Sequence, residues 1–224
     1  INIEKNQVRF STRVIDSNEK LRRDELISKI NRDISTMISK GDSFRVSNLM
    51  VLYNNMLQSL FDSQIKTLGA VVAILFIMFL ILFRSISLAF ISIVSNIIPI
   101  GIVFGLMGIL KIPLDIMTIT IAAISIGIGV DDTIHYIHRF KEEFKKDHNY
   151  INSMKRAHNS IGYAMTYTSL AVIIGFSILL LSNLIPTIYF GILTVIVMVT
   201  ILASALILLP RLIILMKPFK VKKV

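Results

Sequence analysis

The chain has 224 residues, of which 54% are hydrophobic and only 17% are charged, and its formal net charge is +10. Soluble domains carry about 25% charged residues. This composition, with a mean hydropathy of +0.72, argues against a soluble enzyme, a disordered chain and a fibrous protein, and it is typical of a polytopic membrane protein. No cysteine is present in these residues, so disulfides, thiolate metal sites and cysteine nucleophiles are excluded within them.

The N-terminal residues 1–65 have the pattern of a small extracytoplasmic α/β fragment. Partial alternation of apolar and polar residues predicts strands, and an intervening stretch with helical spacing predicts a helix that Ser17 or Asn18 would cap. The expected order is a strand at 7–15, a helix at 18–39 and a strand at 43–52. Such a βαβ unit is too small to be stable alone, so we expect it to pack on further parts of a longer protein.

Residues 66–216 are expected to form a helical membrane domain, which makes the fold class mostly α. Each of five apolar segments reaches the roughly 17–25 residues that a bilayer-spanning helix needs. No Gly, Pro or turn cluster interrupts residues 53–68, so the first span should continue a helix from about residue 53. The five predicted spans are 67–83, 86–110, 115–138, 160–182 and 187–209.

Basic residues orient this bundle. Twelve Lys and Arg fall in the turn after the first span, the loop at 139–159 and the region after the fifth span, whereas the opposite short loops carry only Lys111. The positive-inside rule therefore places the loop and the tail at 217–224 in the cytoplasm and the N-terminal segment outside. Because these charges punctuate apolar runs, we expect no nucleic-acid partner. The loop itself is either a short amphipathic helix on the membrane surface or a solvated connection.

Two adjacent acids, Asp131 and Asp132, lie in the cytoplasmic third of the predicted span at 115–138. An ionised carboxylate there costs several kcal/mol, so such residues face a bundle interior or water and are functional by default. Since two neighbouring acids resist double ionisation, the pair can hold or release a proton. His135 lies on the same face and is either a second proton acceptor or an interfacial residue, and we favour the interfacial role.

Other polar and small residues are expected near the acid pair. Interhelical hydrogen bonds are the simpler role for each hydroxyl or amide group, and close helix packing is the simpler role for each glycine. Residues that could support a proton relay are His135, Thr133, Thr166, Thr168, Ser169 and Asn96. Residues that could shape helix packing are Gly127, Gly129 and Pro99.

We expect no catalytic residue, no metal and no cofactor. Asp131, Asp132, His135 and His138 share one helix, and no second cluster of ligands is visible. The Gly-Val-Asp stretch resembles a motif of intramembrane aspartyl proteases, but that chemistry needs a second Asp on another helix. Outside the pair, the nearest candidate is Asp115, at the opposite membrane face.

The stretch Gly127-Ile-Gly129-Val-Asp131-Asp132-Thr133-Ile-His135 resembles the acidic motif of the resistance–nodulation–division superfamily of proton-driven exporters. It is most similar to the branch with the mycobacterial membrane protein large (MMPL) family, the hopanoid exporters and Patched. The order of an outer α/β region and five helices agrees. Further matching stretches are Asn96-Ile-Ile-Pro99, Gly105-Leu-Met-Gly108, Ile112-Pro113-Leu114-Asp115, Gly175-Phe176, Gly191 and Leu208-Leu-Pro210.

The resemblance implies the C-terminal part of one half of a proton-driven exporter in the inner (cytoplasmic) membrane of a bacterium. Asp131 and Asp132 would carry the protons. The implied partners are the lipid bilayer, protons, a hydrophobic or lipid-like substrate, and the other half of the transporter or a second copy of the chain. Two alternatives remain open, a non-transporting sensor or scaffold of the sterol-sensing type and a component of protein export similar to SecD.

Overall fold

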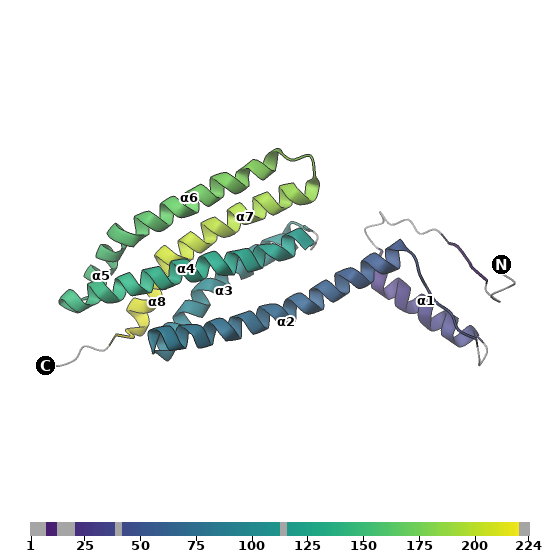
Figure 1. Ribbon diagram of the computed structural model, residues 1–224, viewed down its shortest axis with the longest axis horizontal. Coiled ribbons are helices and arrows are strands. Elements are labelled where there is room, and N and C mark those ends of the chain that lie inside the picture. The colour runs from purple at the N-terminus through teal and green to yellow at the C-terminus, as the bar shows by residue number, and fades with distance from the viewer. Residues whose placement is uncertain (1–7, 13–20, 39–41, 113–115, 220–224) are drawn as a thin grey trace. The chain divides into compact units, whose positions relative to one another are not determined.

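The computed structural model describes residues 8–12, 21–38, 42–112 and 116–219, and most of the described residues are helical (Figure 1). The chain divides into two compact units, Ile1–Phe61 and Asp62–Val224. This division falls close to residue 65, where the sequence pattern changes from the predicted extracytoplasmic fragment to the predicted membrane domain.

The first unit is built on helix α1 (Arg23–Met37) and the beginning of helix α2 (Leu49–Phe83). Asn54 on α2 donates a hydrogen bond from Nδ2 to Asp24 Oδ1 on α1 at 3.4 Å. The guanidinium of Arg23 lies 5.9 Å from the centre of the Tyr53 ring, a distance at which a cation and an aromatic face attract. These two contacts join α1 to the first turns of α2.

The predicted strands are not present among the described residues. Residues 8–12 have no regular secondary structure, and the rest of the first predicted strand lies outside the described residues, as do the expected caps Ser17 and Asn18. The second strand is wrong for residues 49–52, which begin α2. Asn48 explains this, because its Oδ1 accepts a hydrogen bond from the Val51 amide at 2.9 Å and so caps the helix.

The second unit contains the remaining helices. These are α3 (Ile86–Ile109), α4 (Ile116–Asp147), α5 (Tyr150–Ala157), α6 (Tyr163–Ser177), α7 (Ile185–Ala203) and α8 (Leu209–Met216). In the described part of this unit, two π-helical segments, η1 (His158–Gly162) and η3 (Ser204–Leu208), and one 3₁₀ segment, η2 (Ile178–Leu181), connect them. A π segment widens a helix by one residue per turn and leaves part of its hydrogen-bond ladder irregular.

Within the described residues, four helical stretches are long and apolar enough to cross a membrane. They are Leu49–Phe83, Ile86–Ile109, Tyr150–Leu181 and Ile185–Met216, and they contain the predicted spans at 67–83, 86–110, 160–182 and 187–209 wholly or up to the last residue. α4 contains most of the predicted span at 115–138 but is not one of the four. α2 continues through residues 62–67 without a break, as predicted.

The region at 139–159, for which a short amphipathic helix and a solvated connection were both open, is mostly helical. α4 continues to Asp147 because Phe140 and Phe144 keep an apolar face that is completely buried or nearly so. The predicted amphipathic helix is present as α5, but its apolar residues Tyr150 and Met154 pack on this face of α4. The Tyr150 hydroxyl also donates to the Phe219 carbonyl at 2.9 Å and accepts from the Phe219 amide at 3.0 Å.

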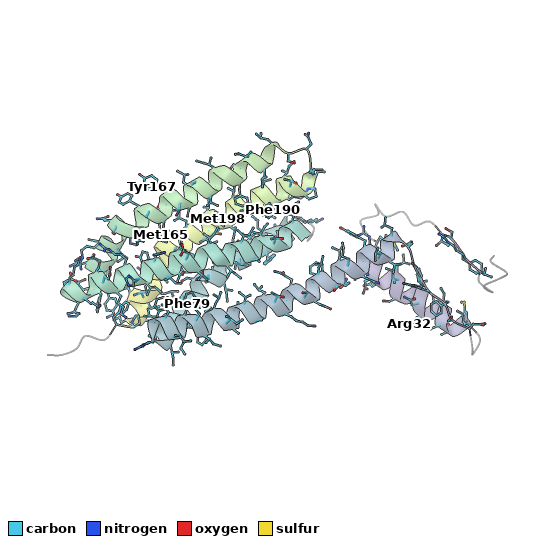
Figure 2. The ribbon with its side chains drawn as sticks, in the orientation of Figure 1. Arg32, Phe79, Met165, Tyr167, Phe190 and Met198 are labelled. Atoms are coloured by element: carbon cyan, nitrogen blue, oxygen red, sulfur yellow. The ribbon has the colours of Figure 1, made fainter. Side chains whose placement is uncertain are left out.

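Within the second unit α4 packs against α3, α5 and α7, and α6 packs alongside α7 (Figure 1). Met165 and Met198 are almost completely buried between these helices, whereas Tyr167 on α6 points outward (Figure 2). One cluster of buried apolar residues, which includes Phe79, Tyr136 and Leu209, joins α2, α4 and α8. We call the end of the bundle around Arg84, the α4–α5 connection and Lys217 the basic end.

Candidate functional site

The two acids of α4 have opposite environments. The side chain of Asp131 is 72% exposed, whereas Asp132 is 7% exposed. Neighbouring residues on an α-helix point about 100° apart, so one carboxylate can face the bundle while the other faces away from it. The structure therefore divides the pair into an inner acid, Asp132, and an outer acid, Asp131.

The inner acid is buried without a hydrogen-bond partner for one of its oxygens. Asp132 Oδ2 is one of three buried side-chain polar atoms that lack a partner among the described residues. Ser95 Oγ on α3 is another of these atoms. Because an unpaired buried polar group costs free energy, both positions are suited to a proton, a water molecule or a rearranged neighbour.

Asn96 joins α3 to α4 beside Asp132. Its Nδ2 donates to Thr133 Oγ1 at 2.9 Å and to the Ser92 carbonyl at 2.8 Å. Asn96 Oδ1 lies so close to Gly129 that a Cβ atom at that position would collide with it. Gly129 thus permits the close approach of the amide, whereas a Cβ at Gly127 would meet nothing within 4 Å.

The outer acid belongs to an exposed polar stripe on α4. His135 Nε2 lies 3.4 Å from Asp131 Oδ1, and His138 Nδ1 lies 3.8 Å from Glu142 Oε1. All four side chains are between 47% and 72% exposed. Among the described residues no group of three His, Asp or Glu side chains has the geometry of a metal site.

The three hydroxyl residues of α6 that were predicted to support a relay differ in their exposure. Thr166 donates to the Gly162 carbonyl at 2.8 Å and Thr168 donates to the Met165 carbonyl at 3.0 Å. Both threonines are exposed, and these hydrogen bonds stay within the same helical stretch. Ser169 is buried, at 3% exposure. The hydroxyls of the two threonines therefore bind their own helix and not the acids of α4.

Pro99 lies within α3 and is buried. Proline has no amide hydrogen, so the carbonyl of Ser95, one turn earlier, has no regular helical donor. The Ser204 hydroxyl of η3 donates a hydrogen bond to this carbonyl. The part of α3 around Pro99 is therefore tied to η3, beside the Asn96 contact with α4.

A second buried carboxylate, Glu143, did not stand out in the sequence. Its side chain is 2% exposed and pairs with Arg139 at 3.0 Å, Lys146 at 2.8 Å and Arg156 at 2.8 Å. Arg156 also pairs with Asp147 at 2.9 Å. The spacing of Arg139, Glu143 and Lys146 at i, i+4 and i+7 was the available signal, but it lay in a segment predicted to be a loop.

The basic neighbours keep these carboxylates ionised. The hydrogen bond from Lys146, together with that from Arg156 and the charge of Arg139, holds the pKa of Glu143 below its usual range despite its burial. The hydrogen bond from Arg156 lowers the pKa of Asp147 further below its ordinary value. This cluster fixes the end of α4 to α5 at the basic end of the bundle.

Two comparisons with known proteins give matches, and one of them identifies the family. A stretch of 80 residues is 36% identical to the membrane protein MJ1562 of Methanocaldococcus jannaschii, covering 36% of this chain and 21% of that protein. The match thus spans about a fifth of that relative's length. The family model described as the MMPL family matches residues 33–223, which include the acid pair and all of α2 to α8. Together with the four apolar helices, these matches show that the chain is a multi-pass membrane protein belonging to the MMPL family.

Proposed function

We propose that this chain is part of a proton-driven exporter of hydrophobic or lipid-like molecules, with Asp131 and Asp132 as the proton-binding pair. The observation that carries the proposal is the burial of Asp132 with one carboxylate oxygen unpartnered among the described residues. Such a carboxylate is costly when ionised and far less so when protonated. A change in its protonation therefore alters the packing of α4 against its neighbours.

We also propose that α4 is a fifth membrane span. Its first part is apolar up to Asp131, and its last part, from Arg139, carries the charged cluster. With five spans, the twelve basic residues lie on one side of the membrane, which favours a cytoplasmic basic end and an extracytoplasmic N-terminal unit in a cytoplasmic membrane. Because α2 is continuous from Leu49 to Phe83, it links such a bundle covalently to the N-terminal unit.

The exposed stripe of α4 supports a partner within the membrane. Asp131, His135 and His138 would be expensive to expose to lipid, so we propose that the other half of the transporter, or a second copy of this chain, covers them. The acid pair would then lie between two bundles. Proton binding to Asp131 and Asp132 would change the charge on both sides of α4.

Substitution of each acid in the intact protein tests the proposal. Asp131→Asn and Asp132→Asn keep the volume and hydrogen-bonding capacity of the side chain but cannot change charge. Each should abolish proton flux into proteoliposomes while leaving the amount of membrane-inserted protein unchanged. Flux should be normalised to that amount.

The same experiment separates transport from the alternative class of function. Wild-type proton flux in both variants would mean that the pair is not a relay. Absence of proton flux in the wild-type protein itself would favour a sensor or scaffold with the same fold.

A further inference from the structure

Two prolines free two backbone carbonyls in the second unit, and a side chain from another segment binds each of them. Pro99 frees the Ser95 carbonyl, which accepts from Ser204. Pro210, near the start of α8, likewise has no amide hydrogen to donate to the Leu206 carbonyl four residues earlier. His158 Nε2 lies 2.8 Å from this Leu206 oxygen, across 48 positions of sequence. His158 therefore supplies the hydrogen bond that Pro210 cannot.

The same imidazole also contacts α4. His158 Nδ1 lies 3.0 Å from the Tyr136 hydroxyl, and the two rings meet edge to face with centres 5.5 Å apart. Tyr136 is fully buried. It follows Asp132 by four residues, which places the two side chains on the same face of α4. His158 thus connects the face of the inner acid to η3.

The protonation of the ring nitrogens decides whether this bridge forms. A carbonyl oxygen only accepts, so Nε2 must carry a hydrogen to bind Leu206. Nδ1 can then accept from the Tyr136 hydroxyl. Nδ1 also lies 2.9 Å from the Met154 carbonyl of the preceding turn, so the tautomer with its hydrogen on Nδ1 would bind locally and release Leu206.

The bridge joins two irregular parts of the helices. His158 is the first residue of the π segment η1, and Leu206 is the middle residue of the π segment η3. A Cβ atom on Gly162, at the end of η1, would lie 3.5 Å from Leu206 Cδ2. π segments occur frequently at functional sites, and their irregular ladders are places where a helix can bend.

We propose that His158 is a positioning residue that ties η1 and α4 to the Leu206 carbonyl. The region of α7–α8 around η3 then moves together with α4. This inference rests on the proposed function. When the charge of Asp132 changes and α4 repacks, Tyr136 and His158 carry the displacement to η3. The Ser204 bond to Ser95 then passes it to α3. Loss of the bridge would uncouple the acid from these helices without removing the acid.

The experiment uses the intact protein in proteoliposomes and measures proton flux and thermal unfolding. His158→Ala should lower flux about fivefold, the effect of losing one hydrogen bond of ordinary strength. His158→Gln should restore it, because the amide can donate to Leu206 and accept from Tyr136. Pro210→Ala gives Leu206 an amide donor within its own helix. His158→Ala should therefore cost much less flux in a Pro210→Ala background than with Pro210 present.

Each alternative outcome is decisive. Wild-type flux in His158→Ala, or an equal loss with and without Pro210, would overturn the bridge. If His158→Ala does not accumulate in the membrane, His158→Gln carries the test, and reduced flux in that variant would overturn it. Asp131→Asn and Asp132→Asn are measured in parallel. Wild-type flux in both acid variants contradicts the proposed function, whereas lost flux there with normal flux in His158→Ala contradicts only the role of His158.

Discussion

Asp132 and Glu143 are both buried carboxylates on α4, about three helical turns apart, and their surroundings are opposite. Glu143 pairs with Arg139, Lys146 and Arg156. Asp132 has an oxygen without a partner among the described residues. Three cations pair with the carboxylate of Glu143, whereas Asp132 makes no ion pair among the described residues. At its basic end α4 therefore carries an ion-pair cluster around Glu143 that fixes it to α5. In its apolar part it carries Asp132, a carboxylate suited to a change of charge.

The largest effect on stability should come from removing the negative charge of Glu143 in the ion-pair cluster. Glu143→Gln leaves Arg139, Lys146 and Arg156 around a neutral side chain, and their mutual repulsion is no longer offset. We expect this substitution to lower Tm more than any other single substitution proposed for this protein, and to loosen α5 from α4. Thermal unfolding in detergent measures the first effect, and proteolysis at the α4–α5 connection measures the second. An unchanged Tm would show that the ion-pair cluster does not hold α5 on α4.

The pH dependence of stability tests whether the ionised carboxylates at the basic end stabilise the protein. The folded pKa values of Glu143 and Asp147 lie below the ordinary values of 4.5 and 3.8. Their stabilising effect is therefore complete above those values and is lost as the pH falls through the lower folded ones. Between about pH 5 and pH 3, the wild-type protein should lose stability faster than Glu143→Gln. Parallel unfolding curves for the two proteins would contradict this role of the carboxylates.

The difference between the two carboxylates also explains what could be predicted from the sequence. Asp131 and Asp132 stood out because charge is rare in an apolar span. The last residue of α2, Phe83, and the first residue of α3, Ile86, could be predicted because Arg84 interrupts the apolar run. Glu143 was not found, because a charged segment in sequence does not distinguish a solvated loop from a helix whose charges pair with one another. Only the packing of Phe140 and Phe144 decides between these.

The remaining site residues depended on long-range contacts. The contact between Asn96 and Thr133 needed the register of α3 against α4, which helical periodicity alone does not give. The bond from His158 to the carbonyl freed by Pro210 joins two distant π segments, and no sequence pattern marked either segment. The hydroxyls of Thr166 and Thr168 were placed near the acids by residue type, but the orientation of α6 turns them away.

The close approach of Asn96 to α4 can be tested with two neighbouring glycines. Gly129→Ala places a methyl group against Asn96 and should cost about 1–3 kcal/mol, the usual range for overpacking. Gly127→Ala is the matched control, because open space surrounds that position, and it should be neutral or slightly stabilising. Chemical denaturation of both variants measures the difference. Equal effects would mean that α3 and α4 are not held at this distance.

A smaller effect is expected at the outer acid's neighbour. His135 is 61% exposed and contacts Asp131 at 3.4 Å, so His135→Ala should reduce proton flux less than Asp131→Asn does. Flux measured over a range of pH would show any shift of the profile. A loss as complete as that of the acid variant would make His135 an essential member of the relay.

The smallest effects should come from the threonines of α6. Thr166→Val and Thr168→Val remove only hydrogen bonds to carbonyls of the same helical stretch. Each variant should stay within about 0.5 kcal/mol of the wild-type free energy of unfolding and keep its proton flux. Loss of flux in either variant would return these hydroxyls to the relay.

The contrast between the two buried carboxylates is tested most directly by infrared difference spectroscopy of the intact protein between acidic and neutral pH. A protonated carboxyl group has a carbonyl stretching band that a carboxylate lacks. We expect such a band in the wild-type protein, a weaker band in Asp132→Asn because its carboxyl group no longer contributes, and an unchanged band in Glu143→Gln. A band that is unchanged in Asp132→Asn but weaker in Glu143→Gln would show that the two residues have the opposite roles.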